Sequence, residues 1–136
     1  MTERIEALFD LVVARETQRV EYQLSYFEKR NRAVTLLDQT AGPVDALLSH
    51  GEIAHVHPSD GSMHMILSRA DARETIDHGW GELHPLAGVM LNLPVTYTLI
   101  YPPRDTEELA VTGRILDASV AHMTGQLVAP QEEIRA

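Results

Sequence analysis

The sequence predicts an α+β fold, in which a small antiparallel or mixed β-sheet is covered on one side by helices and preceded by a long N-terminal helix or helix pair. Three observations predict it. Apolar residues near the N-terminus recur at three- and four-residue spacing, as on one face of a helix. Residues 53–67 alternate with period two around a turn sequence, and helix-capping signals occur near residues 68 and 105.

Length and composition limit the possible functions. The 136 residues are enough for one domain over residues 1–136, and the net charge of −9 disfavours nucleic acid and anionic membrane surfaces as partners. The absence of cysteine excludes disulfides, thiolate metal ligands and a cysteine nucleophile. No apolar run approaches the roughly 18 residues of a membrane-spanning helix, so we expect a cytoplasmic protein without a membrane partner.

The N-terminal segment, residues 1–42, is predicted to be helical. Thr2 can cap a helix whose apolar residues are Ile5, Leu8, Phe9, Val12 and Val13. Val20, Leu24, Phe27, Val34 and Leu37 roughly continue the stripe, with no Pro or Gly before residue 42. This predicts one long helix, or two helices that break near Thr17 or Asn31. Such a helix either packs along its own sheet or pairs with a second copy, so a homodimer through this helix is one expectation.

A β-hairpin is predicted next. Residues 53–57 and 62–67 alternate in polarity, and the Pro-Ser-Asp-Gly sequence between them favours a turn. With a four-residue loop, His55 faces His64 across the ladder, and His57 faces Ser62. Because successive side chains of a strand point to opposite faces, the three histidines share one face. The other face then carries Ala54, Val56, Met63, Met65 and Leu67.

Three helices and two strands complete the predicted fold. A short helix begins at Pro43 and ends before Gly51. Ser68 can cap a second helix that ends near Ile76, with Gly79 beyond it in the left-handed conformation. The last elements are a short strand at 82–84, a strand at 93–101, a helix capped by Asp105 with Glu108 in the capping-box position, and a loose tail at 124–136.

Three motifs together indicate a family. They are His-Val-His-Pro-x-Asp-Gly-Ser-Met-His at 55–64, Gly-Trp-Gly-Glu-Leu-His-Pro at 79–85, and Tyr-Thr-Leu-Ile-Tyr-Pro-Pro-Arg-Asp-x-Glu-Glu at 97–108. In order and spacing, residues 43–123 resemble the uncharacterised "luciferase" domain family of bacteria and fungi, and the N-terminal part is left unmatched. A flavin-dependent light-emitting barrel needs about 250 residues, so the resemblance does not imply that reaction. It implies that the following positions match recurrent residues of the family: His55, His64, Trp80, Glu82, His84, Pro85, Arg104 and Asp105.

The first functional hypothesis is metal-free acid–base chemistry on a small polar or anionic metabolite, in a cleft between the sheet and a loop that carries Trp80. Histidine exchanges protons near neutral pH, and Glu82 lies two residues before His84. The expected catalytic residues are His64, His84 and Glu82, with no cofactor. The expected substrate-binding residues are His55, His57, Trp80, Tyr97, Tyr101 and Arg104.

Two other hypotheses remain open. His55, His57 and His64 on one face could bind a divalent metal such as zinc or non-haem iron, with His84 or Glu82 completing the site. Alternatively, the cleft binds a small molecule or a protein without catalysis, although one tryptophan, four tyrosines and two phenylalanines offer few aromatic groups for an interface. The sequence lacks the glycine-rich dinucleotide motif, the phosphate loop and the serine-hydrolase elbow.

Overall fold

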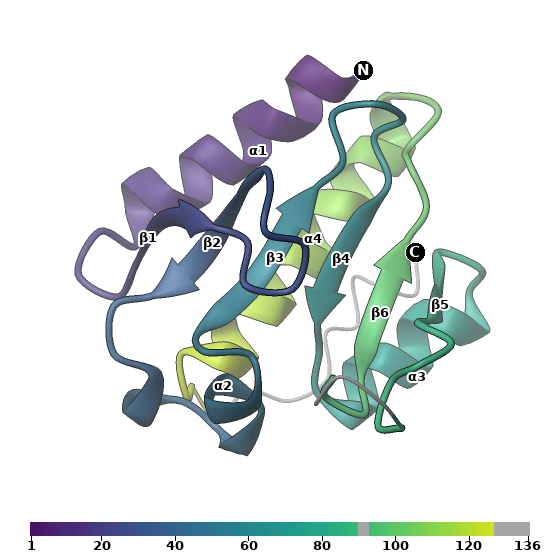
Figure 1. Cartoon of the computed structure of the whole chain (residues 1–136). Helices are drawn as coiled ribbons and strands as arrows, with labels where there is room; N and C mark the ends of the chain where they lie inside the picture. Colours follow the sequence, from purple (N-terminus) through teal and green to yellow (C-terminus); the bar gives the residue numbers. More distant parts are fainter. Residues whose placement is uncertain (90–92, 127–136) are drawn as a thin grey trace.

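A computed structural model describes residues 1–89 and 93–126 (Figure 1). In these residues, six strands form one antiparallel sheet in the order β1-β2-β3-β4-β6-β5. The helices are α1 (Thr2–Arg15), α2 (Val44–Leu48), α3 (Arg69–Asp77) and α4 (Thr106–Met123), with a 3-10 turn at Gln39–Ala41. The strands are β1 (Val20–Leu24), β2 (Arg32–Leu36), β3 (Glu52–Val56), β4 (Met63–Ile66), β5 (Gly81–Leu83) and β6 (Tyr97–Ile100).

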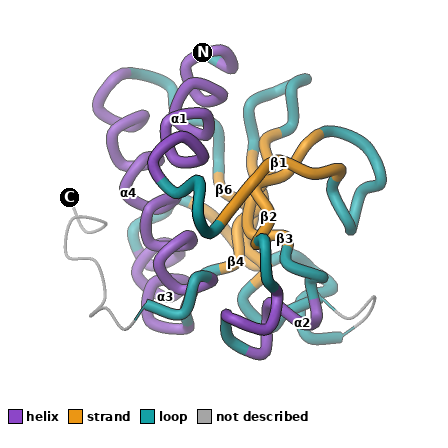
Figure 2. Tube along the Cα trace, turned by 90° about the vertical axis from the view of Figure 1, so that its left-hand side faces the viewer, coloured by secondary structure: helices purple, strands orange, loops and turns teal. Residues whose placement is uncertain are grey.

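The helices α1, α3 and α4 lie on one face of the sheet, and α2 lies near one end of it (Figure 2). The longest helix, α4, contacts the central strands β3 and β4. Between them lies a core of fully buried side chains that includes Met63, Met65, Ile115 and Leu116. The predicted α+β class, with helices on one side of an antiparallel sheet and a helix at the N-terminus, is confirmed.

The predicted hairpin and the helix caps at Ser68 and Asp105 are also confirmed. The predicted cap at Thr2 is wrong, because Thr2 is the first residue of α1 and no side chain caps that helix. In the ladder between β3 and β4, His55 is opposite His64, and the backbone N–H of His57 donates to the carbonyl of Ser62. The Ser68 hydroxyl accepts from the backbone N–H of Asp71 at the start of α3. The Asp105 carboxylate does the same for α4. These local signals set where the elements begin, because each satisfies a backbone group that the first helical turn leaves free.

The prediction that helix continues through residues 20–37 is wrong. The helix ends at Arg15, and β1 and β2 form an antiparallel hairpin. Lys29 and Asn31 in the connecting loop both have φ of 59°, which a helix does not allow. Residues 33–36 are buried on both faces of the sheet, so their sequence lacks the alternation that identifies a half-buried strand. A spacing of apolar residues that fits a helix therefore occurs here in two strands.

The other predicted boundaries need smaller corrections. The last strand begins at Tyr97 rather than residue 93, and Pro94 in the turn before it has no N–H to donate to a ladder. Residues 124–126 continue from α4 through backbone hydrogen bonds such as that from the Thr124 N–H to the Val120 carbonyl. The rest of the predicted loose tail, residues 127–136, lies outside the described residues.

The apolar face of α1 packs within the chain. Ile5, Phe9 and Val12 are buried in the common core, and Arg15 forms an ion pair of 2.8 Å with Asp117 of α4. Pairing of two copies through this helix stays a prediction. Within residues 1–89 and 93–126, no helix combines the length and apolar character that crossing a bilayer requires.

Replacement of Met65 by alanine tests the position of the core. Met65 is fully buried on the helix-covered face, so the truncation should lower the free energy of unfolding by about 2–5 kcal/mol. The matched control is Leu11→Ala, because Leu11 is 65 % exposed and should change stability by less than about 0.5 kcal/mol. Urea denaturation followed by circular dichroism measures both. Equal effects of the two substitutions would contradict the assignment of this face to the core.

Candidate functional site

Four side chains converge on the sheet face opposite the helices. They are Glu28 from the β1–β2 loop, His55 from β3, His57 just after β3, and His64 from β4. One donor atom from each lies within 4.8 Å of all the others. The predicted gathering of three imidazoles on one face is thus present, and a carboxylate from an unexpected segment joins it.

The backbone explains why these groups meet. His55 and His64 are cross-strand partners, and His57 lies two residues beyond His55 on the same face. The β1–β2 loop folds over β3 (Figure 1), and the left-handed conformation of Lys29 and Asn31 turns the chain back toward β2. Glu28 therefore reaches the histidines from above the sheet.

The distances between donor atoms are short and similar. Nε2 of His55 lies 3.3 Å from Nε2 of His57 and 3.2 Å from Nδ1 of His64. Oε2 of Glu28 lies 3.1 Å from His55, 2.9 Å from His57 and 3.5 Å from His64, measured to the same nitrogen atoms. Four atoms with lone pairs thus surround one point.

Hydrogen bonds outside the cluster orient two of the rings. Nδ1 of His55 is 2.6 Å from Oε2 of Glu52, a carboxylate that can only accept, so Nδ1 carries a proton. Ser62 donates its hydroxyl proton to Asp60 at 2.7 Å, which leaves its oxygen to accept from Nδ1 of His57 at 2.8 Å. In the neutral tautomer of either ring, Nε2 then has a free lone pair directed at the centre of the cluster.

The cluster also shifts the pKa values of its members. Burial lowers the pKa of His55, but hydrogen bonds with Glu28 and Glu52 outweigh burial and raise it to about 9. Hydrogen bonding with His55 lowers the pKa of Glu28 to about 2, against the effect of burial. Burial and the neighbouring imidazoles lower the pKa of His64 to about 3. Without a metal ion, His55 is therefore more readily protonated than His64.

A groove opens beside the cluster. It has a volume of about 280 Å³ and is lined by Tyr26, Phe27, Glu28, Lys29, His64, His84, Leu93 and Tyr97. The ring centroid of His84 lies 5.5 Å from that of His64. Nδ1 of His84 accepts the backbone N–H of Leu86 at 3.1 Å, so the proton of the neutral ring is on Nε2. The predicted residues His84 and Tyr97 thus belong to the same groove as His64.

The remaining predicted site residues lie elsewhere. Glu82 is on the same sheet face as His64, but Leu99 of β6 stands between them, and Glu82 accepts from the hydroxyl of Tyr101 at 3.2 Å. Trp80 packs against the core and lines a separate cavity together with Arg104. Arg104 forms an ion pair of 2.6 Å with Glu108 in α4. The expectation that a loop carrying Trp80 covers the imidazoles is wrong, because the ring packs into the core.

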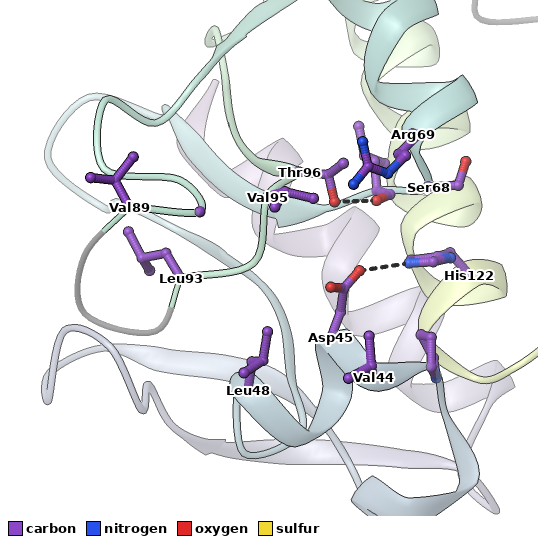
Figure 3. A pocket seen from close by; sticks show the side chains of 13 residues that line it. Val44, Asp45, Leu48, Ser68, Arg69, Val89, Leu93, Val95, Thr96 and His122 are labelled. Atoms are coloured by element: carbon purple, nitrogen blue, oxygen red, sulfur yellow. Dashed lines mark hydrogen bonds and ion pairs between the residues drawn. The ribbon is translucent and has the colours of Figure 1, made fainter.

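Another cavity is also separate from the cluster. Its volume is about 710 Å³, and Figure 3 shows Asp45 and His122 paired in its wall, with Nε2 of His122 3.1 Å from Oδ2 of Asp45. Apolar side chains, among them Val44 and Val89, form much of its wall. Leu93 lines both this cavity and the groove beside the histidines.

Sequence reasoning missed two carboxylates, Glu28 and Glu52. Glu28 lies in the segment that the sequence predicts to be helical, and no local motif links it to histidines 27–36 residues later in the chain. Glu52 precedes His55 by three residues, a spacing that in a strand does not predict a contact. The burial of Glu52, which is 2 % exposed at the start of β3, identifies it only once the fold is known.

Comparisons with known proteins agree with the motifs. Residues 50–119 match the family described as "Luciferase domain". Proteins named "Luciferase" from Armillaria gallica and Armillaria mellea are each 40 % identical to the chain over 125 residues, which covers 83 % of this chain and 46 % of each relative. The "Luciferase" of Neonothopanus nambi is 36 % identical over 134 residues, covering 90 % and 49 %. No solved structure matches.

Two facts follow from these matches. The chain spans about half the length of the curated relatives it matches. An alignment over 90 % of the chain must also include part of residues 1–42, which the motifs left unmatched. The similarity to this relative therefore extends into residues 1–42, the segment that contains Glu28.

The difference in pKa between His55 and His64 can be measured by NMR. In protein treated with a chelator, the imidazole of His55 should titrate with a pKa of about 9 and that of His64 with a pKa of about 3. At neutral pH the first ring is then charged and the second is neutral. Histidine-to-glutamine variants, made one at a time, assign the ring resonances. Titration of both rings near the ordinary value of about 6.5 would contradict the arrangement of carboxylates described above.

Proposed function

The chain belongs to the luciferase domain family, and we propose that it is an enzyme whose reaction centre is a divalent metal ion bound by Glu28, His55, His57 and His64. The ion would bind and activate a small polar or anionic molecule in the adjacent groove. The observation that carries the proposal is the convergence of the four donor atoms.

The spacing of these donors suits a metal ion. Bonds of about 2.0–2.2 Å separate the ligands of a tetrahedral ion by about 3.3–3.6 Å, and neighbouring ligands of an octahedral ion by about 2.8–3.1 Å. The five donor separations quoted above range from 2.9 to 3.5 Å.

The surroundings of the donors support the same function. Histidines that bind metals usually donate their second ring N–H to a carboxylate or another acceptor, as Glu52 and Ser62 accept here. Oε1 of Glu28 is buried and has no hydrogen-bond partner among the described residues. It is available as a further ligand or as an acceptor for a metal-bound group.

The donor set favours particular ions. Three imidazoles and a carboxylate suit zinc, iron and manganese, whereas calcium and magnesium prefer oxygen alone. Four protein ligands close a tetrahedral zinc site, but an ion with five or six ligands keeps positions open for a substrate. Since Glu28 and His64 line the groove, we infer that the open positions face it and that iron or manganese is the catalytic ion.

The groove suggests the class of substrate. Its volume of about 280 Å³ fits a small molecule, and the side chain of Lys29 is the cation at its rim in a protein of net charge −9. The Nε2–H group of His84 is placed to exchange a proton with a bound molecule. This assigns His84 the acid–base role predicted from sequence but shifts the activation of the substrate to the metal.

Two other hypotheses have less support. Metal-free catalysis by His64, His84 and Glu82 requires three groups to act together, and Glu82 is separated from the others by the side chain of Leu99. Binding without catalysis would not require the open coordination positions that we infer for the metal ion, so it leaves them without a role. The relatives are named as luciferases, and that name denotes an enzyme. Because the relatives are about twice as long, light emission is not part of the proposed activity.

Metal analysis tests the centre. Protein expressed without a histidine tag should hold about one divalent ion per chain after loading with Fe²⁺, Mn²⁺, Co²⁺ or Zn²⁺ and removal of loose metal. Glu28→Gln and His64→Ala each remove one ligand and should abolish stoichiometric binding or weaken it at least 100-fold, measured by mass spectrometry of the metal and by competition with a chelator.

The control is His78→Ala, because His78 lies at the end of α3 and pairs with Glu74 rather than with the cluster. It should bind metal as the wild type does. Wild-type protein that retains no stoichiometric ion under any of these conditions would refute the metal centre.

The open coordination position has its own test. The visible spectrum of Co²⁺-loaded protein should change on addition of azide or acetate, because each small anion can enter the groove and bind the ion. Lys29→Ala should weaken this binding by up to about fivefold, since an exposed charge contributes at most about 1 kcal/mol. A spectrum that no anion alters would identify a closed, structural metal site and contradict the proposed catalysis.

A further inference from the structure

We propose that Glu52 is the positioning residue of this centre, one buried carboxylate that fixes the orientation of His55 and holds the loop that brings Glu28 to the metal. The inference rests on the proposed metal centre and assigns a role to a residue that does not itself bind the ion. The two carboxylate oxygen atoms of Glu52 contact different parts of the site: Oε2 contacts His55, and Oε1 contacts the loop.

The first oxygen acts on His55. Oε2 of Glu52 lies 2.6 Å from Nδ1 of His55, and neither side chain is exposed to solvent by more than 2 %. A carboxylate at this position requires a proton on Nδ1. The metal-facing Nε2 is then left with its lone pair, and the ring is held in the plane that directs this lone pair at the cluster.

The second oxygen acts on the β1–β2 loop. Oε1 of Glu52 accepts from the Ser25 hydroxyl at 2.8 Å and from the backbone N–H of Tyr26 at 2.7 Å, with the N–H of Phe27 at 3.5 Å. These three residues immediately precede Glu28. The carboxylate therefore attaches the loop to β3 at the point where the loop must deliver its ligand.

The charge of Glu52 indicates that this side chain positions other groups and does not merely fill space. A buried carboxylate is costly to desolvate, and an apolar side chain would fill the same space more favourably. Among the described residues, the hydrogen bonds of its carboxylate are with His55 of the cluster and with the loop that carries Glu28. Two of the four ligands, from two distant segments, thus depend on one acceptor-only group.

Replacing Glu52 by glutamine removes the charge but keeps the shape. If the amide oxygen accepts from Ser25 and Tyr26, the amide NH₂ faces Nδ1 of His55. That ring must then carry its proton on Nε2, where the metal should bind. If the amide is turned around, its NH₂ faces the N–H of Tyr26 and the loop loses its acceptor. Either orientation disables one ligand.

The test compares Glu52→Gln with wild type and with Glu107→Gln, an identical chemical change at an exposed position of α4. Competition with a chromogenic chelator measures zinc affinity, which Glu52→Gln should reduce about 10- to 100-fold and Glu107→Gln should leave unchanged. Circular dichroism of the metal-free proteins checks that they fold. Nitrogen-15 NMR of the zinc-loaded wild type should show His55 with a proton on Nδ1 and metal on Nε2.

A second variant separates the two tasks of Glu52. Ser25→Ala removes the hydroxyl that donates to Glu52 at 2.8 Å and accepts from the backbone N–H of Glu28 at 3.2 Å. It leaves the contact between Glu52 and His55 intact, so it should lower zinc affinity less than Glu52→Gln does, without changing the tautomer of His55. If Glu52→Gln does not fold, this variant and the wild-type tautomer decide the matter.

The outcomes distinguish the two proposals. Equal zinc affinity of Glu52→Gln and wild type, or an unprotonated Nδ1 of His55 in the zinc-loaded protein, overturns the role of Glu52 and leaves the metal centre in place. A wild-type protein that binds no zinc, iron or manganese overturns both.

Discussion

The site depends on a single buried interaction, the contact of the Glu52 carboxylate with His55 on one side and with the β1–β2 loop on the other. A charge in the interior is tolerated only where donors surround it, so this carboxylate forces strand and loop together. The loop then closes over the sheet and places Glu28 against three imidazoles. The contact thus links the strand that carries His55 to the loop that carries Glu28.

Much of the fold could be predicted because its signals are local. The turn at residues 58–61 sets the register of β3 and β4, and a shift by one residue would bury the histidines and expose Met63 and Met65. Ser68 and Asp105 mark helix starts by their own hydrogen bonds. The β1–β2 hairpin could not be recognised in the same way. Its second strand is buried on both faces, so its apolar residues do not alternate, and spacing alone cannot distinguish it from a helix.

The sequence also predicts part of the site, namely the part that local signals determine. The pairing of His55 with His64 follows from a four-residue loop, and His84 and Tyr97 reach the groove through neighbouring strands. Glu28 meets His57 across 29 residues of sequence, and nothing in either segment signals the contact before the fold is known. The sequence also predicts Trp80, Glu82, Tyr101 and Arg104 at the site, but their own contacts hold them elsewhere. Leu99 lies between Glu82 and His64, Trp80 packs against the core, Tyr101 donates to Glu82, and Arg104 pairs with Glu108.

The two faces of the sheet differ: the helix-covered face forms the core, and the opposite face carries the cluster that we propose binds a metal ion. The most direct test is anomalous diffraction from crystals of the metal-loaded protein, recorded at the absorption edge of the ion. The account predicts one strong peak about 2.0–2.2 Å from Nε2 of His55, Nε2 of His57, Nδ1 of His64 and a carboxylate oxygen of Glu28. A peak at surface histidines alone, or an ordered cluster without any peak, would contradict it.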